Sequence, residues 1–398
     1  MKKQNKKAPA RPLGAWLHRS RWSLLALLIA ALLFAGFRLW LREPATEPLT
    51  GGDFVEYEKA RVEQILNDNS LQDEASDGGW RGEQMLTARV LTGRYAGEAL
   101  LCYNYIGPLY GVPISEGDEV VLTVSTYTGG EHRATVFEYN RIPALLILLG
   151  LFVLITVLVG GKTGLRSLVG LAVTVAVLFG VLLPLLMRGA PTILSTFLCC
   201  AYVAAVAFLL LGGLQRKTVC AALGTIAGTA LAMLFGLMAQ SLCRVSGLRI
   251  SDVEPLLQLR QTGTPIGLRG LLVAGVIVSS LGAVMDVAMS IASALDEVHA
   301  ANPALGFRDL LRSGMNIGRD MVGTMTNTLI LAFLGSGFTL ILYLYSLGLS
   351  RYQLFSSAYV AIEVISSLSS SIGMILAIPI TAVISSGLVS RGSKEDKA

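Results

Sequence analysis

Charged side chains are scarce in this sequence. Asp, Glu, Lys and Arg make up 15% of its 398 residues, whereas an ordinary soluble domain has nearer a quarter. Hydrophobic residues make up 53%, and the mean hydropathy is +0.62. A chain of this composition would expose large apolar patches in water. The composition therefore excludes an ordinary soluble domain and predicts a protein of the lipid bilayer.

Residues that build common functional sites are also few or scattered. The three histidines, His18, His132 and His299, lie far apart, so they do not predict a zinc site. The five cysteines show no regular spacing. Lys and Arg lie between apolar runs and do not cluster on one domain, which excludes a nucleic-acid-binding face. The sequence predicts no cofactor and no nucleic-acid partner.

The N-terminal segment predicts a membrane anchor. Residues 1–21 are basic, and residues 22–40 form an apolar run. The run resembles a signal peptide, but no small-residue cleavage site follows it, and Arg38 and Arg42 flank its far end. We expect an uncleaved anchor at 22–40, with the basic N-terminus 1–21 in the cytoplasm.

Residues 43–140 have a different character, with more charged residues and shorter apolar runs. A helix is expected at 56–69 and a polar loop at 68–79. Strands are expected at 84–91, 100–105, 119–125 and 133–137, because apolar residues alternate there between glycine-rich turns, Gly129-Gly130 among them. This spacing predicts a small β-rich extracytoplasmic domain, a barrel or a sandwich, with an OB-like barrel as one form.

Long apolar runs fill residues 142–388. A run of about 20 apolar residues crosses the hydrocarbon layer as a helix. Spans are expected at 142–159, 168–187, 192–214, 219–242, 268–295, 321–347 and 354–388. With the anchor, they predict an α-helical polytopic membrane protein of about eight transmembrane helices.

Loop charges predict the orientation of these spans. Lys162, Arg216 and Lys217 fall in loops on the expected cytoplasmic side, and the tail 389–398 is basic. The positive-inside rule then puts both termini in the cytoplasm of a plasma-membrane protein. One connection departs from the rule, because the outer loop 244–265 carries Arg244, Arg249 and Arg260.

Two further patterns bear on packing. Gly224, Gly228, Ala232 and Gly236 recur every four residues, which puts them on one helical stripe and predicts close helix packing. Residues 302–319 mix apolar and charged side chains, which fits either a short amphipathic helix in the membrane interface or an ordinary polar loop.

The last three spans each carry a carboxylate within a polar stripe. Asp286 and Ser290 share one helical face, Asp320 and Asn327 share a second, and Glu363 and Ser370 share a third. Asp320 lies near the cytoplasmic interface, where a charge costs little. An ionised carboxylate deeper in the membrane costs at least about 2.5 kcal/mol. These oxygen ligands suit protons or hard cations, and a neutral carboxyl that bonds to neighbouring helices is the structural alternative.

The last span is longer than one crossing needs, and the Ser-rich tract 366–371 interrupts it. Discontinuous helices of this kind line midplane sites in secondary transporters. A steeply tilted, continuous helix explains the length equally well.

Three segments carry a family resemblance. GAVMDVAMSIASALDE at 282–297, GMNIGRDMVGTMTNTLILAFLGSG at 314–337 and ISSLSSSIGMILAIPITAVIS at 365–385 resemble the YibE/F-like family of bacterial membrane proteins. The resemblance covers the helical bundle strongly and the anchor and β-rich domain in general plan. It implies an architecture and a location but no catalytic residues.

Three functions fit these patterns to different degrees. The polar stripes favour a transporter or permease with a proton or cation path through Asp286, Ser290, Asp320, Asn327, Glu363 and Ser370. The separate β-rich domain favours an assembly or sensor module that binds an extracytoplasmic protein. No hydrolase, metalloprotease or phosphate-loop motif occurs, so we expect no enzyme. The sequence leaves the oligomeric state open.

Overall fold

The computed structural model of the protein describes residues 54–126, 132–249, 253–261 and 263–395. The chain divides into two compact units, Glu43–Thr156 and a second unit that includes Val157–Ala398. The basic N-terminus 1–21, the predicted anchor 22–40 and the predicted Gly129-Gly130 turn lie outside the described residues.

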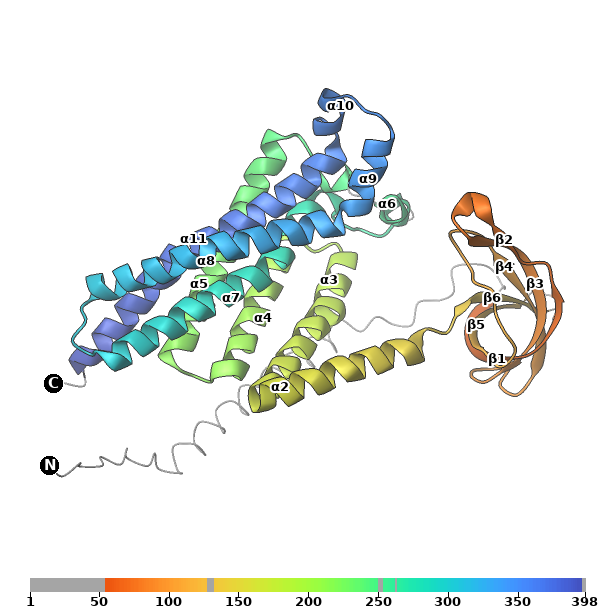
Figure 1. Ribbon diagram of the computed structural model, residues 1–398, viewed down its shortest axis with the longest axis horizontal. Helices are drawn as coiled ribbons and strands as arrows, with labels where there is room; N and C mark the ends of the chain where they lie inside the picture. The colour runs from red at the N-terminus through yellow and green to blue at the C-terminus, as the bar shows by residue number, and fades with distance from the viewer. Residues whose placement is uncertain (1–53, 127–131, 250–252, 262, 396–398) are drawn as a thin grey trace. The chain divides into compact units, whose positions relative to one another are not determined.

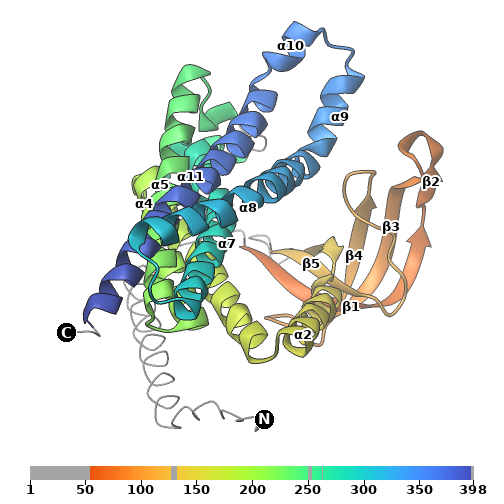
Figure 2. The ribbon, with the colours of Figure 1, turned by 60° about the vertical axis from the view of Figure 1, so that its left-hand side comes forward.

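The strands of the first unit form a barrel-like sheet (Figures 1 and 2). They are β1 (Phe54–Asp68), β2 (Leu71–Asp73), β3 (Gly79–Val90), β4 (Ala99–Ile106), β5 (Glu119–Thr126) and β6 (His132–Tyr139). β1 pairs with both β5 and β3, so the order β1-β5-β6-β4-β3 closes on itself, and β2 pairs with one end of β3. β4 and β6 are parallel, and the other pairs are antiparallel. The predicted β-rich domain is confirmed as a barrel-like form.

Alternate residues of the strands fill the interior of this barrel. Those at most 1% exposed include Leu86, Ala88 and Val90 of β3 and Val120, Leu122 and Val124 of β5. Successive side chains of a strand point to opposite faces, so a buried face requires this period of two. The same alternation in the sequence located the strands β3 to β6.

Two buried amides add a polar contact to the apolar barrel core. Gln84 and Asn104 are each 1% exposed. The Oε1 atom of Gln84 accepts hydrogen bonds from Asn104 Nδ2 at 3.0 Å and from the backbone N–H of Ile114 at 2.9 Å. Its Nε2 atom donates to Asp68 Oδ2 at 2.8 Å. Because both amides have partners, the core avoids the cost of buried unsatisfied polar groups.

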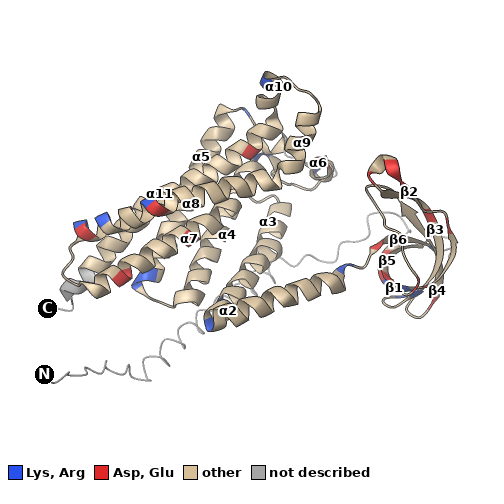
Figure 3. Ribbon diagram, viewed as in Figure 1, with Lys and Arg blue, Asp and Glu red and all other residues tan. Residues whose placement is uncertain are grey.

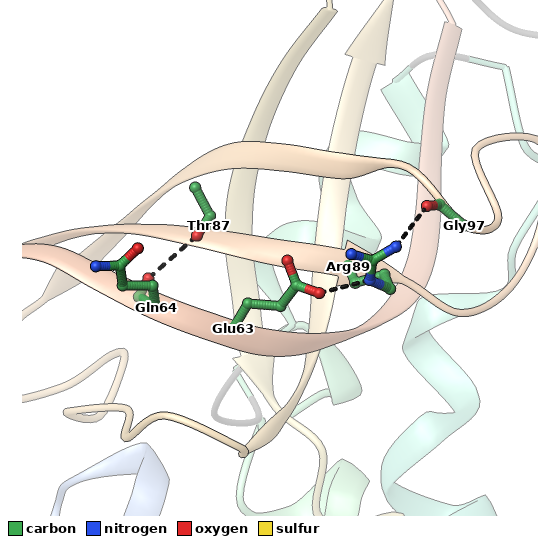
Figure 4. A network of polar contacts seen from close by, with 5 residues as sticks. All are labelled: Glu63, Gln64, Thr87, Arg89 and Gly97. Atoms are coloured by element: carbon green, nitrogen blue, oxygen red, sulfur yellow. Dashed lines mark hydrogen bonds and ion pairs between the residues drawn. The ribbon is translucent and has the colours of Figure 1, made fainter.

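The helix predicted at 56–69 is wrong, because β1 covers this segment. β1 pairs with β5 through its first half and with β3 through its second half. Across the β1–β3 pair, Arg89 donates to Glu63, and Thr87 Oγ1 donates to the backbone oxygen of Gln64 (Figure 4). Irregular register near Val62 disturbs the simple alternation of the strand. Pairing on both edges therefore overrides the local pattern.

The second unit consists mainly of long helices. The first of these helices begins in the first unit and continues into the second. They are α2 (Ile142–Val177), a π-helical turn (Leu178–Leu182), α3 (Leu183–Met187), α4 (Thr192–Gly212), α5 (Arg216–Leu242), α6 (Glu254–Gln261), α7 (Leu271–Ala301), α8 (Phe307–Ser336), α9 (Phe338–Ser346), α10 (Arg351–Phe355) and α11 (Ala358–Glu395). Short 3-10 turns lie at Gly247–Arg249 and Leu268–Gly270.

Five helices of the described residues are long and apolar enough to cross a membrane, and the bent pair α8–α9 makes a sixth. Several such helices indicate a membrane protein. The predicted count of about eight is not reproduced, partly because the spans predicted at 142–159 and 168–187 fall within one helical run, Ile142–Met187. Gly161 interrupts this run with φ 53° and ψ −133°.

The predicted small-residue stripe lies where α5 packs against α7 and α11. A Cβ atom at Gly228 would lie 2.6 Å from the Cβ of Ala377, and a Cβ at Gly373 would lie 2.5 Å from the Cβ of Ala232. The stripe therefore lets the backbones of α5 and α11 approach closely, which stabilises helix pairs in lipid.

The structure decides between alternatives that the sequence left open for two C-terminal segments. Residues 307–319 are helical, but they form the start of the longer helix α8, where Leu310, Gly314 and Gly318 are buried. The last span is continuous as α11, with Pro379 inside it. The break lies in the preceding span, where α8 and α9 meet at an angle of 59° beside Gly337 (Figure 2).

Candidate functional site: carboxylates of the last three spans

Contacts at small residues fix how α7, α8 and α11 lie together. A Cβ atom at Gly314 of α8 would lie 3.0 Å from Leu295 of α7 and 3.1 Å from Ala382 of α11. Farther along, the hydroxyls of Ser279 and Ser370 lie 3.0 Å apart and share a hydrogen bond. Contacting residue numbers rise together on α7 and α11, so these two helices run parallel.

Asp286 and Ser290 share the exposed face of α7, as their spacing predicts. Val287, Ala288 and Ile291, which lie between and beside them in the sequence, are 0% exposed and pack into the bundle. No hydrogen bond or ion pair to the Asp286 carboxylate is found among the described residues. The deep carboxylate predicted from the sequence thus lies on a helix face that the described chain leaves uncovered.

Asp320 and Asn327 lie on the exposed face of α8. Gly314 and Gly318 on the same helix are buried against α7 and α11. The polar stripe of α8 is therefore turned away from the packed interface. Figure 3 shows how sparse charged residues are along these helices, which makes each carboxylate conspicuous.

Glu363 has different surroundings, because it is half-buried beside the bend between α8 and α9. Its Cδ atom lies 3.4 Å from the position that a Cβ would have at Gly337. The side chain lines a pocket of about 360 Å³, together with Phe333, Leu340, Phe355 and other apolar residues of α8 to α11. Ser367 is the other polar side chain among the described residues that line this pocket.

Asp286 and Glu363 do not meet in one site. Asp286 follows Ser279 by seven residues on α7, and Glu363 precedes Ser370 by seven on α11. At about 1.5 Å per residue, these positions lie about 10 Å from the Ser279–Ser370 contact in opposite directions. The axial separation of the two carboxylates is therefore about 21 Å.

A set of buried hydroxyls was missed in the sequence. Thr225 of α5 and Ser371, Thr381 and Ser386 of α11 are at most 3% exposed, and their hydroxyl oxygens have no hydrogen-bond partner among the described residues. The Thr381 hydroxyl oxygen would clash with a Cβ atom at Gly224, so it faces α5. The Ser-rich tract noted in the sequence includes Ser371, but no sequence pattern predicted that α11 packs against α5.

Among the described residues, the carboxylates lie singly and do not form a cluster that could bind a metal ion. No group of three or more His, Cys, Asp or Glu side chains in the described ranges is arranged to hold a metal ion. At one end of the bundle, Lys217 Nζ lies 3.8 Å from Asp296 Oδ2, and both groups are partly exposed. Such a pair contributes little to stability.

Comparison with known proteins gives one family. A family profile described as YibE/F-like protein matches residues 148–391, which is more than half of the chain. The match includes α7, α8, α9, α10 and nearly all of α11, so it covers the carboxylates of the last three spans. No curated protein and no solved structure matches the chain. The chain belongs to the YibE/F-like protein family.

Proposed function

We propose that the protein is a transporter or permease that moves protons or hard cations across the plasma membrane through α7, α8–α9 and α11. The observation that supports this proposal most is the packing of Glu363 against the bend at Gly337. Broken helices beside ion-binding groups recur in secondary transporters, where they form sites within the membrane. A carboxylate also suits a proton or a hard cation.

The separation of the carboxylates favours two successive sites in this path. Glu363 lies five residues from the start of α11, near one end of the span, whereas Asp286 lies well inside α7. Ser370, which bonds to Ser279, lies between them. Asp286, Ser290, Asp320 and Asn327 would form the second part of the path. A charged Asp facing lipid costs about 2.5–3.5 kcal/mol, which favours a water-filled or covered face there.

The proposal includes a topology with two crossings in the run Ile142–Met187. Its 46 residues would be about 69 Å long as a helix, more than twice the hydrocarbon thickness of about 30 Å. The break at Gly161 supplies a turning point beside Lys162. With the anchor at 22–40, this topology puts both termini in the cytoplasm and the barrel outside. The five closed strands, with one parallel pair, also support an OB-like form for the barrel.

Ion flux in proteoliposomes tests the transport proposal. Glu363→Gln and Asp286→Asn each remove a charge and should lower proton or cation flux at least tenfold. Asp309→Asn, an acidic residue in the first turn of α8, is the matched control and should keep wild-type flux. Equal flux in wild type, Glu363→Gln and Asp286→Asn across the tested ions would refute the proposal.

Thermal unfolding across a panel of cations and pH values gives an independent readout. A ligand at one hundred times its dissociation constant stabilises a protein by about 2.7 kcal/mol. The unfolding midpoint of the wild type should therefore rise with one ion or one pH step. The same step should leave Glu363→Gln or Asp286→Asn unshifted.

A second function, binding of an extracytoplasmic protein by the barrel, has its own supporting observation. Tyr57 and Phe137 are 60% and 58% exposed and pack edge to face with ring centroids 5.2 Å apart. Tyr103 and Tyr105 stack at 6.4 Å on β4. Exposed aromatic residues are enriched at protein interfaces. Deletion of residues 52–139 separates the functions, because a transporter core should keep flux, whereas a binding module should lose its phenotype.

A further inference from the structure

A large groove of the bundle lies at the end of its spans where α7 begins. It has a volume of about 950 Å³. Its walls are the start of α4, the end of α5, α6 and the two 3-10 turns at 247–249 and 268–270. Thr192 Oγ1 donates to the backbone oxygen of Gly267 at 2.8 Å, which holds α4 to the second turn.

Apolar side chains extend from this end into the membrane-spanning part. Ile193, Leu194 and Phe197 line the groove from the first turns of α4. Leu237 and Met233 line it from α5, five and nine residues before that helix ends at Leu242. The apolar lining therefore reaches about 13 Å along the helices from their ends, at about 1.5 Å per residue.

Positive charge is concentrated at the mouth of the groove. Arg260 of α6 and Arg269 of the second 3-10 turn are the ionisable side chains among the described residues that line it, and no carboxylate accompanies them. Arg260 is fixed by a hydrogen bond to the backbone oxygen of Ile266 at 2.6 Å. This mouth includes part of the arginine-bearing loop that departs from the positive-inside rule.

We propose that this groove binds an anionic phospholipid of the surrounding bilayer. Its headgroup phosphate would lie between Arg260 and Arg269, and an acyl chain would lie along Phe197, Met233 and Leu237. The occupant follows from charge complementarity and from the position of the groove. The ends of α4, α5 and α7 place the arginines at headgroup level and the apolar wall at acyl-chain level. Arginine pairs well with phosphate oxygens, because its planar guanidinium donates two parallel hydrogen bonds.

Lipid-dependent thermal unfolding of the full chain in a neutral detergent tests this proposal. Dioleoylphosphatidylglycerol, which is anionic, should raise the unfolding midpoint at lower concentrations than zwitterionic dioleoylphosphatidylcholine. The double variant Arg260→Gln/Arg269→Gln should need about tenfold more of the anionic lipid for half its effect. The double variant Arg244→Gln/Arg351→Gln removes the same charge from exposed residues outside the groove and should behave as wild type.

Two further variants keep the test decisive if loss of the Arg260 hydrogen bond disturbs folding. Arg269→Gln alone should weaken the effect of the anionic lipid at least threefold. Leu237→Trp keeps both arginines but fills the acyl-chain part of the groove, so it should weaken the effect as well. Equal shifts by the two lipids in wild type, or equal losses in the groove and control double variants, would overturn the proposal.

Discussion

Single glycines decide how closely α5 and α11 approach. Gly228 packs where a Cβ would lie 2.6 Å from Ala377 and 2.7 Å from Val284. Gly236 lies on the same stripe, but its nearest contact would be an ordinary 3.5 Å from Val276. The two glycines therefore form a matched pair for one substitution.

We expect Gly228→Ala to destabilise the bundle, because the added methyl group overpacks the α5–α7–α11 interface. Overpacking of this kind costs about 1–3 kcal/mol. Gly236→Ala should leave the unfolding midpoint in detergent close to that of wild type. Equal midpoints for the two variants would contradict the packing described for α5 and α11.

The barrel contains a residue whose titration links its stability to pH. Asp68 accepts hydrogen bonds from the hydroxyl of Ser70 at 2.6 Å, from the backbone N–H of Ser70 at 2.8 Å and from Gln84. These bonds, led by the Ser70 hydroxyl, hold the pKa of Asp68 below its ordinary value. A lowered folded-state pKa stabilises the fold above the unfolded value of about 3.9.

This contribution should be lost as pH falls through the folded-state pKa of Asp68. Asp68→Asn should therefore lower barrel stability at pH 7 and flatten its decline below about pH 4. Ser70→Ala removes the leading hydrogen bond, so it should give an intermediate profile. Chemical unfolding of the barrel from pH 7 to pH 2 measures how stability depends on pH in wild type, Asp68→Asn and Ser70→Ala. A profile of Asp68→Asn that parallels wild type would contradict this role.

At the scale of secondary-structure elements, the main feature is a break in a long helix. The break in α2 depends on Gly161, whose φ of 53° and ψ of −133° are unfavourable for residues with a side chain. Gly160, its neighbour, has no positive φ, and a Cβ atom there would meet no atom of another element within 4 Å. Of these two adjacent glycines, Gly161 is therefore the one whose backbone conformation requires a residue without a side chain.

Gly161→Ala should destabilise the protein by about 1–3 kcal/mol, because alanine is strained in this backbone conformation. Gly160→Ala should be neutral or stabilise by up to about 1 kcal/mol, since alanine favours helix more than glycine does. Unfolding midpoints of the two purified variants in one detergent measure the difference. If Gly160→Ala destabilised the protein as much as Gly161→Ala, the break would not depend on Gly161.

At the scale of the whole molecule, the barrel and the bundle have separate cores. The barrel core consists of residues from Ala60 to Ala134, and the bundle clusters begin at Val173. A fragment of residues 43–140 should therefore fold alone, with a β-type circular dichroism spectrum and one cooperative unfolding transition. Gradual unfolding without a transition would show that the barrel needs the bundle.

The sequence by itself determined the class of the protein and most of its elements. Apolar runs located the long helices, because a span must be apolar along its whole length in lipid. Strict alternation located β3 to β6, and four-residue spacing placed Asp286 and Ser290 on one face. These features follow from local periodicity, which the chain carries wherever its neighbours lie.

Only the tertiary structure decided what depends on neighbours distant in the sequence. β1 became a strand because two other strands pair with it, although its own residues favoured a helix. The sequence left open whether the Ser-rich last span is broken, whereas the structure has a continuous α11 and a bend beside Gly337 between α8 and α9. The parallel course of α7 and α11 likewise separated Asp286 from Glu363, and no spacing within one span encodes that distance.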